Sequence, residues 1–312
     1  MKSVNIVIPV YNEGQTLFKL LQAIRREVQV LTEIEFIFIV VNDGSTDDTF
    51  DFLDEYCRCN ADTKFISLTR NFGKEAAIMA GLEYSEGEAV IVMDADLQHP
   101  PELIPRMIEL WNQNMDVVEA CKSRRGKETL SRRFLAGSFY RLFELLAERD
   151  LKDHSDFKLL DRKVVNAYVS LPERNRFFRG LIPWFGFSSA RIYFDVPDRS
   201  NGGTRWSSLT LFRLSINALT GFSSAPLYLI NILGVVCLLL SLLIGGVAIY
   251  DKFTGQAVSG FTTVILLILL IGSFIMFGLG LIGVYLGQIF KEIKKRPIYI
   301  VDHSKSSGNN KE

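Results

Sequence analysis

The sequence is poor in the residues that form metal clusters and disulfide frameworks. Its 312 residues include only four cysteines and three histidines. The histidines, His99, His154 and His303, lie far apart along the chain and supply no zinc-binding pattern. The pair Cys57 and Cys59 supplies at most half of such a site. We therefore interpret the cysteines as reduced thiols with structural roles.

The chain also lacks net charge. Its 35 lysines and arginines balance 35 aspartates and glutamates. No segment has the clustered basic character of a nucleic-acid-binding surface, so no RNA or DNA partner is expected. No signal peptide is expected either, because a strand-like run begins directly at Val4. The first domain is therefore expected to stay in the cytoplasm.

Charged residues are absent altogether from residues 215–250 and 253–290. Within these stretches, residues 226–250 and 261–288 are each long enough to cross a hydrocarbon core of roughly 30 Å, and neither has a polar face. The basic stretch at residues 291–296 follows directly. The positive-inside rule therefore predicts a multi-pass protein of the cytoplasmic (inner) membrane with both termini in the cytoplasm.

The C-terminal third carries two further signals. Gly283 and Gly287 have the spacing of small residues that let membrane helices approach closely, which permits a homo-oligomer. Residues 302–312 are polar and have little apolar content. We expect this tail to be disordered.

The first two thirds of the chain alternate strand-like and helix-like segments. Runs rich in β-branched residues occur at residues 4–10, 36–41, 64–68, 89–93 and 116–120. Such alternation predicts an α/β fold with a doubly wound, mostly parallel sheet. Ligands of such sheets bind beyond the carboxyl ends of the strands. The polar residues that follow each run are therefore the candidates for a functional site.

Asp94, Asp96 and Gln98 follow the fourth run, where hard oxygen ligands suit Mg²⁺ or Mn²⁺ shared with a diphosphate. Asp-x-Asp is also frequent in surface turns, but its position after a parallel strand favours the metal site. Asp43 follows the second run, where its carboxylate could contact a base or ribose, or the next helix could use it as a cap. Lys74 lies at a helix start and opposes the helix dipole, which indicates an anionic partner such as a phosphate.

Two segments have the 3.6-residue period of amphipathic helices with basic margins. Residues 131–147 either pack on the sheet or lie at a membrane surface. Residues 205–225, directly before the first apolar segment, favour an interfacial position. The expected organisation is a globular cytoplasmic domain at residues 1–204, the interfacial helix, a two-helix membrane domain at residues 226–290 and a basic cytoplasmic tail at residues 291–312.

Seven motifs, taken in order, resemble those of the family 2 glycosyltransferases that act on polyprenyl phosphates. They are residues 8–13 (IPVYNE), 42–49 (NDGSTDDT), 71–74 (NFGK), 94–101 (DADLQHPP), 156–162 (DFKLLDR), 172–180 (PERNRFFRG) and 199–207 (RSNGGTRWS). With the two apolar segments, the resemblance covers nearly the whole chain and is strongest to the bactoprenol glucosyltransferases. It implies a GT-A fold, a divalent metal ion and inversion at the anomeric carbon.

The resemblance also implies roles for individual residues. The residues expected to bind the nucleotide sugar are Pro9, Tyr11, Glu13, Asp43, Lys74 and Asp94. The residues expected to bind the metal and its diphosphate are Asp94, Asp96 and Gln98. Asp156 matches the acidic residue proposed as the catalytic base, and Asp96 is the second catalytic candidate.

The chemistry of a phosphate acceptor restricts what Asp156 needs to do. A phosphate monoester has a second pKa of about 6, so it is largely dianionic at neutral pH and hardly needs deprotonation. Asp156 would then orient the sugar or bind a hydroxyl group. A dianion does need cations, and the candidates with suitable guanidinium groups are Arg124, Arg179, Arg199 and Arg205. Each of these could equally be a solvated surface charge.

The leading hypothesis is an inverting transfer of glucose from UDP-glucose to undecaprenyl phosphate at the cytoplasmic membrane face. The choice of glucose rests on the resemblance alone, and an aminoarabinose derivative or mannose from GDP-mannose is an alternative. A processive polysaccharide synthase is disfavoured because two spans cannot readily enclose a sugar channel. A non-catalytic membrane scaffold would be favoured had Asp94 or Asp96 been lost, but both are present.

Overall fold

The computed structural model of the chain describes residues 1–124, 155–174, 176–195 and 260–306, together with scattered residues between 230 and 254. By their contacts these residues divide into two compact units. The first unit holds the described residues up to 195 and those from 296 onward, and the second holds those between 230 and 295. The predicted amphipathic segments, residues 131–147 and 205–225, lie outside the described residues.

The first unit is built on a seven-stranded sheet in the order β3-β2-β1-β4-β6-β5-β7. The strands are β1 (Lys2–Val10), β2 (Ile34–Asn42), β3 (Thr63–Ser67), β4 (Ala89–Val92), β5 (Val117–Arg124), β6 (Lys158–Asp161) and β7 (Ser189–Asp195). Neighbouring strands are parallel except at β6, which runs antiparallel to β4 and β5. The predicted mostly parallel sheet is confirmed, and β1 to β5 match the five predicted strands.

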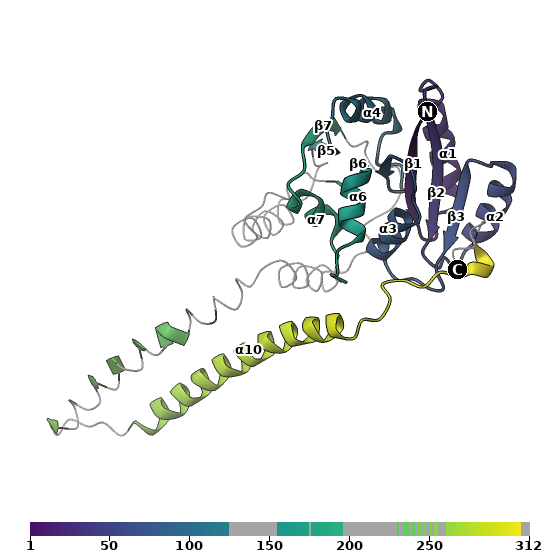
Figure 1. Cartoon of the computed structure of the whole chain (residues 1–312). Helices are drawn as coiled ribbons and strands as arrows, with labels where there is room; N and C mark the ends of the chain where they lie inside the picture. Colours follow the sequence, from purple (N-terminus) through teal and green to yellow (C-terminus); the bar gives the residue numbers. More distant parts are fainter. Residues whose placement is uncertain are drawn as a thin grey trace. The chain divides into compact units, whose positions relative to one another are not determined.

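Helices cover both faces of the sheet (Figure 1). They are α1 (Gly14–Val28), α2 (Thr49–Cys59), α3 (Lys74–Glu83), α4 (Ile104–Asn112), α6 (Arg162–Val169) and α7 (Phe178–Trp184), with the 3-10 helix η1 (Pro101–Leu103) before α4. On one face, Val4, Ile6 and Ile8 of β1 share a core with side chains of α1, α2 and α4. On the other face, a Cβ added to Gly81 of α3 would overlap the Val7 side chain. This alternation is the two-residue period of a strand that is buried on both faces.

The sequence pattern does not predict β6 and β7. Strand β6 has only four residues and begins with the buried Lys158, so it does not form an apolar run. In β7 exposed and partly exposed residues alternate, and Phe194 is the buried one. These strands are stabilised by pairing with β4 and β5, and pairing between distant segments leaves little trace in local periodicity.

Two loops at the carboxyl edge of the sheet pack directly against each other. Gly44, which follows β2, has a φ of +65°, a left-handed conformation that glycine adopts more readily than other residues. A Cβ at this position would lie 2.6 Å from the Arg70 Cα atom, well inside contact distance. Glycine at position 44 therefore lets the loop after β2 lie against the loop after β3.

The second unit contains the 33-residue helix α10 (Phe261–Ile293). At 1.5 Å per residue it is about 50 Å long, which exceeds a hydrocarbon core of roughly 30 Å. Among the described residues it is the one helix long and apolar enough to cross a membrane, over Leu270–Phe290, and only 6% of its most apolar window is buried. It coincides with the predicted segment 261–288. The other predicted span, residues 226–250, lies only partly within the described residues.

The prediction of a disordered tail is wrong for residues 302–306. Asp302 N donates to Ser67 O of the edge strand β3 at 2.8 Å. The following residues form the 3-10 helix η2 (His303–Lys305), which lies beside β3 (yellow in Figure 1). An edge strand presents unpaired backbone groups. A polar segment can therefore become ordered by pairing with them, without burying much apolar surface.

We expect Gly44→Ala to lower the free energy of unfolding more than Gly186→Ala does. Gly186 also has a left-handed φ, +72°, but no atom lies within 4 Å of its Cβ position, so only backbone strain of about 1 kcal/mol applies there. At Gly44 the overlap with the Arg70 backbone adds to this strain, for about 2 to 4 kcal/mol in total. Thermal unfolding of both variants in detergent measures the difference. Equal losses of stability would contradict the close packing of the two loops.

Candidate active site

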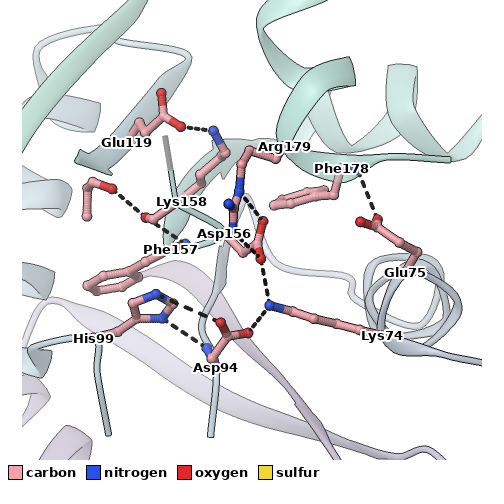
Figure 2. A network of polar contacts seen from close by, with 12 residues as sticks. Lys74, Glu75, Asp94, His99, Glu119, Asp156, Phe157, Lys158, Phe178 and Arg179 are labelled. Carbon is pink, nitrogen blue, oxygen red and sulfur yellow. Dashed lines mark hydrogen bonds and ion pairs between the residues drawn. The ribbon is translucent and has the colours of Figure 1, made fainter. Parts of the chain in front are cut away.

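The candidate site is built around the Lys74 ammonium group, which contacts two carboxylates (Figure 2). Lys74 is the first residue of α3, and its Nζ atom lies 2.5 Å from Asp94 Oδ1 and 2.6 Å from Asp156 Oδ2. Asp94 follows β4, and Asp156 precedes β6. Because β6 runs antiparallel to β4, with Lys158 opposite Val92, it begins where β4 ends. The antiparallel strand therefore brings Asp156 to the same sheet edge as Asp94.

Arg179 of α7 is the second cation on Asp156. Its Nε atom donates to Asp156 Oδ1 at 3.2 Å, and its Nη2 atom donates to Oδ2 at 2.9 Å, which is the forked geometry that guanidinium groups form with carboxylates. Asp156 is only 6% exposed. Burial opposes ionisation of this carboxyl group, but Lys74 and Arg179 together outweigh burial and hold the pKa of Asp156 well below its usual range. Asp156 is therefore a carboxylate at neutral pH.

Lys74 occupies a position that is unfavourable for a cation by itself. The first turn of a helix carries the positive end of the macrodipole, and burial lowers the pKa of the Lys74 ammonium group. Asp94 and Asp156 more than compensate and raise the pKa of Lys74 above its ordinary value. The Lys74 side chain is 42% exposed, so part of this residue faces solvent at the edge of the sheet.

A buried histidine fixes the backbone at Asp94. His99 is 3% exposed and stacks on Phe157, with ring centroids 5.3 Å apart. Its Nδ1 atom accepts a hydrogen bond from Asp94 N at 3.2 Å, so the neutral ring carries its proton on Nε2. The Nε2 atom lies 3.9 Å from Asp94 Oδ2. His99 therefore orients the start of the loop that follows β4.

Asp94, Asp96 and Gln98 offer oxygen ligands on this short loop. Asp96 is exposed, and its Oδ1 atom accepts a hydrogen bond from Gln98 N at 3.1 Å. Leu97 between them has a φ of +59°, and backbone strain of this kind occurs at functional sites. Within the described part of the chain, no three His, Cys, Asp or Glu side chains are grouped to hold a metal ion. Carboxylate and amide oxygens are nevertheless ligands that suit a hard divalent cation, and such a cation keeps few protein ligands when it also binds a diphosphate.

The residues predicted to bind the nucleotide lie at the ends of β1 and β2. Pro9 is buried within β1, and Tyr11 just beyond it is 43% exposed. Asp43 is 3% exposed, and its two carboxylate oxygens accept hydrogen bonds from Phe72 N at 2.7 Å and Gly73 N at 2.9 Å. Burial raises the pKa of Asp43 against the effect of these two bonds. In the structure Asp43 therefore anchors the loop that precedes α3.

Side-chain hydrogen bonds join the loops after β1 and β2. Asn12 N donates to Ser45 Oγ at 3.0 Å, and Thr46 N donates to Asn12 Oδ1 at 2.8 Å. Glu13 is the N-cap residue of α1, and its backbone N donates to Thr49 Oγ1 at 3.2 Å. These bonds hold the two predicted nucleotide-binding loops together.

Of the four arginines predicted to bind the acceptor phosphate, Arg179 is the one whose side chain the structure describes. Arg124 ends β5, where it pairs in register with Asp195 of β7. Arg199 and Arg205 lie outside the described residues. The described part of the chain thus brings one of the four arginines to the candidate site.

Three charged residues near the candidate site are not singled out by the sequence pattern. Glu119 of β5 and Lys158 of β6 stand opposite each other and form an ion pair, at 4% and 0% exposure. Glu75 accepts a hydrogen bond from Phe178 N at 2.9 Å. Two features of the sequence could have pointed to two of these residues. Lys158 stands directly before the apolar residues Leu159 and Leu160, and Glu75 follows the lysine of the motif at residues 71–74.

Residues 5–169 match a family model described as glycosyl transferase family 2. The chain is 40% identical over 301 residues to an uncharacterised glycosyltransferase of Synechocystis sp., covering 95% of this chain and 94% of that one. It is 33% identical to a prophage bactoprenol glucosyl transferase homologue of Escherichia coli, covering 97% and 99%. It is 34% identical to the bactoprenol glucosyl transferase of Shigella phage SfII, covering 96% and 98%. A solved structure of TarS from S. aureus is similar with a TM-score of 0.47 and 19% identity, over 70% of this chain and 64% of that one.

The matched family model spans the strands and loops that carry Asp43, Asp94 and Asp156. The relatives match this chain over nearly its whole length. The protein is therefore a transferase enzyme, and the chain belongs to glycosyltransferase family 2.

Proposed function

We propose that this glycosyltransferase transfers glucose from UDP-glucose to undecaprenyl phosphate, with inversion at the anomeric carbon. The observation that carries the proposal is the contact of one ammonium group, on Lys74, with both Asp94 and Asp156. This contact connects the loop of Asp94, which carries the candidate metal ligands, with Asp156, which matches the acidic residue proposed as the catalytic base in the family. Relatives named bactoprenol glucosyl transferases support glucose as the sugar and a polyprenyl phosphate as the acceptor.

The donor is proposed to lie across the loops that follow β1, β2 and β4. Its uridine would contact Pro9, Tyr11, Glu13 and Asp43. Because Asp43 also holds the loop before α3 through two backbone hydrogen bonds, it would shape the wall of the nucleotide site as well as contact the ligand. The exposed part of the Lys74 side chain is within reach of a diphosphate bound at this edge.

A divalent cation, Mg²⁺ or Mn²⁺, would be held by Asp94, Asp96 and Gln98 together with the donor diphosphate. When bound, such a cation offsets the negative charge that develops on the departing UDP. Asp96 supports this role because the residue is exposed beyond the end of β4. Asp94 supports it by its fixed backbone, which His99 holds.

The reaction forms a bond between an acceptor phosphate oxygen and the anomeric carbon, and it breaks the bond between that carbon and the UDP oxygen. Attack from the face opposite UDP inverts the configuration. The acceptor phosphate has a second pKa of about 6, so no proton has to be removed from the nucleophile at neutral pH. The protein then contributes chiefly by positioning both substrates and by offsetting their charges.

Asp156 is proposed to orient the sugar. Despite its burial, Lys74 and Arg179 hold the pKa of Asp156 well below its usual range. A carboxylate with so low a pKa is a weak base at neutral pH. It can instead accept hydrogen bonds from a sugar hydroxyl group while it keeps Arg179 in place.

The acceptor phosphate is proposed to lie against Arg179, with Arg124, Arg199 and Arg205 as further cations. The Arg179 side chain keeps 35% of its surface exposed while it contacts Asp156. A dianion must approach an edge that already carries carboxylates. Guanidinium groups offset this repulsion and match the geometry of phosphate oxygens.

The helix α10 is proposed to span the cytoplasmic membrane, together with the second predicted span. Its apolar side chains are exposed along its length, for example Leu270, Ile275, Met276 and Leu286. Such a surface needs apolar surroundings. The basic residues at 291–296 favour a cytoplasmic end, so the transferase would lie on the cytoplasmic side of the membrane.

The full-length protein in detergent should transfer radiolabelled glucose from UDP-glucose to undecaprenyl phosphate in the presence of Mg²⁺. UDP-galactose, GDP-mannose and a UDP-aminoarabinose derivative, offered in parallel, should give at least about tenfold less lipid product. Extraction into organic solvent and counting measures the product. Labelled lipid mainly from another donor would replace glucose and keep the reaction class. No labelled lipid from any donor would refute the proposal.

Asp96→Asn should raise the Mg²⁺ concentration needed for half-maximal turnover by at least about tenfold, because the metal site loses a charged ligand. Glu102→Gln, which changes an exposed acid a few residues further along, is the matched control and should leave it unchanged. A Mg²⁺ titration at fixed donor concentration measures both variants. An unaltered Mg²⁺ requirement in Asp96→Asn would remove this residue from the metal site.

Asp156→Asn should lower kcat by about 100-fold and leave the KM for UDP-glucose within about threefold, because the carboxylate is proposed to act on the reacting sugar more than on the nucleotide. Asp54→Asn, which alters an exposed ion pair on α2, should behave as the wild type does. Steady-state kinetics with both substrates measures the effect, and thermal unfolding checks that each variant is folded. Wild-type turnover by Asp156→Asn would exclude a catalytic role.

A further inference from the structure

Glu75 connects the candidate site to the short helix α7 (Figure 2). It follows Lys74 in the first turn of α3, and its Oε2 atom accepts a hydrogen bond from Phe178 N at 2.9 Å. Phe178 is the first residue of α7, and the next residue, Arg179, donates to Asp156. Of two consecutive residues of α3, Lys74 therefore contacts Asp156 directly, and Glu75 contacts the helix whose Arg179 binds Asp156.

Helix α7 depends on outside contacts because it is short. It has seven residues, and one of them is Pro183, which lacks an N–H group. Its N-cap residue, Phe177, makes no side-chain hydrogen bond to the helix. A helix of this length is not stable by itself in water, and its first N–H groups need acceptors from elsewhere. The carboxyl group of Glu75 supplies one and so fixes the turn from which Arg179 extends.

We propose that Glu75 is a positioning residue for the transfer reaction: its carboxyl group holds the first turn of α7 so that the Arg179 guanidinium group stays on Asp156. Glu75 acts through Arg179 and does not touch the reacting groups. The kinetic consequences of this role rest on the proposed function. The contact with Phe178 can be tested without any substrate.

The surroundings of Glu75 make its charge sensitive to pH near neutrality. Burial, with repulsion from Asp156, raises the pKa of Glu75 to about 7, against its backbone hydrogen bond and the attraction of Lys74 and Arg179. Tyr168 of α6 is a further titratable group near Glu75, and burial and Glu75 raise its pKa so far that it stays neutral. A carboxylate accepts a stronger hydrogen bond than a protonated carboxyl group does. The hold on α7 therefore strengthens as the pH rises through about 7.

Glu75→Gln and Glu75→Ala separate the charge from the contact. Glutamine keeps an acceptor oxygen and resembles the protonated acid, so kcat/KM for undecaprenyl phosphate should lie within about twofold of wild type at pH 6 and about three- to tenfold below it at pH 8. Alanine loses the acceptor, and we expect about a tenfold loss at both pH values. The acceptor phosphate titrates equally in all variants, so the ratio to wild type isolates Glu75. The KM for UDP-glucose should change by less than about twofold.

Glu83→Gln is the matched control. Glu83 lies on the same helix and accepts a hydrogen bond from Tyr299 Oη at 2.6 Å, so the same substitution is made on an acid that does not contact α7. Its kinetics should equal those of the wild type at pH 6 and pH 8. A pH-dependent loss in Glu83→Gln like that in Glu75→Gln would overturn the specific role of Glu75.

Hydrogen exchange of the peptide that covers residues 177–181 tests the contact in the absence of substrates. At pH 8 its first amides should exchange about tenfold faster in Glu75→Ala than in the wild type, with Glu75→Gln in between. If this change occurs but the wild type makes no labelled lipid, the proposed function fails and the positioning contact stands.

Wild-type exchange in Glu75→Ala would overturn the proposal, as would a ratio of Glu75→Gln to wild-type kcat/KM that is the same at pH 6 and pH 8. Thermal unfolding and UDP binding show whether each variant is folded. If Glu75→Ala does not fold, the pH dependence and exchange of Glu75→Gln decide the outcome, because the glutamine keeps the shape and the acceptor of the natural side chain.

Discussion

Charge compensation at the carboxyl edge of the sheet is the constraint on which the site depends. Asp94 and Asp156 would repel each other if they met alone, and at short range this repulsion would be strong in a partly buried site. The Lys74 ammonium group contacts both, and Arg179 adds a second cation on Asp156. The two cations therefore balance the two carboxylates, which are proposed to bind a metal ion and a sugar.

The antiparallel strand β6 makes this arrangement possible, but it also requires a lysine side chain to be buried. The chain must reach the carboxyl edge and begin a strand there, which only an antiparallel strand does. The first residue of β6, Lys158, is then buried, and burial together with Arg179 and Arg191 lowers its pKa well below the ordinary value. Glu119 on the next strand offsets that charge. Removing one partner of such a pair typically costs about 3 to 5 kcal/mol.

Local patterns in the sequence predict the parts of this site but not how they meet. The strand runs and the loops after them are local features, so β1 to β5 and the loop of Asp94 could be predicted. The contact of Lys74 with Asp156 joins residues 82 positions apart and depends on the direction of a four-residue strand that has no clear pattern. The position of Lys74 at a helix start indicates an anionic partner such as a phosphate. In the structure its anionic partners are the carboxylates of Asp94 and Asp156. The contact of Glu75 with Phe178 also joins distant residues, and no local pattern at Glu75 predicts it.

The C-terminal residues show where composition misleads. Disorder was expected because a polar tail buries little apolar surface, but its order comes from backbone pairing: Thr69 N donates to Ile300 O at 3.0 Å, and Asp302 N donates to Ser67 O at 2.8 Å. The residues that follow this part of β3 form the loop that Asp43 anchors. The chain that follows α10 therefore pairs with the strand that leads into the proposed nucleotide side of the site. If α10 spans the bilayer as proposed, this short covalent connection limits how far the transferase can move from the membrane in which its lipid acceptor lies.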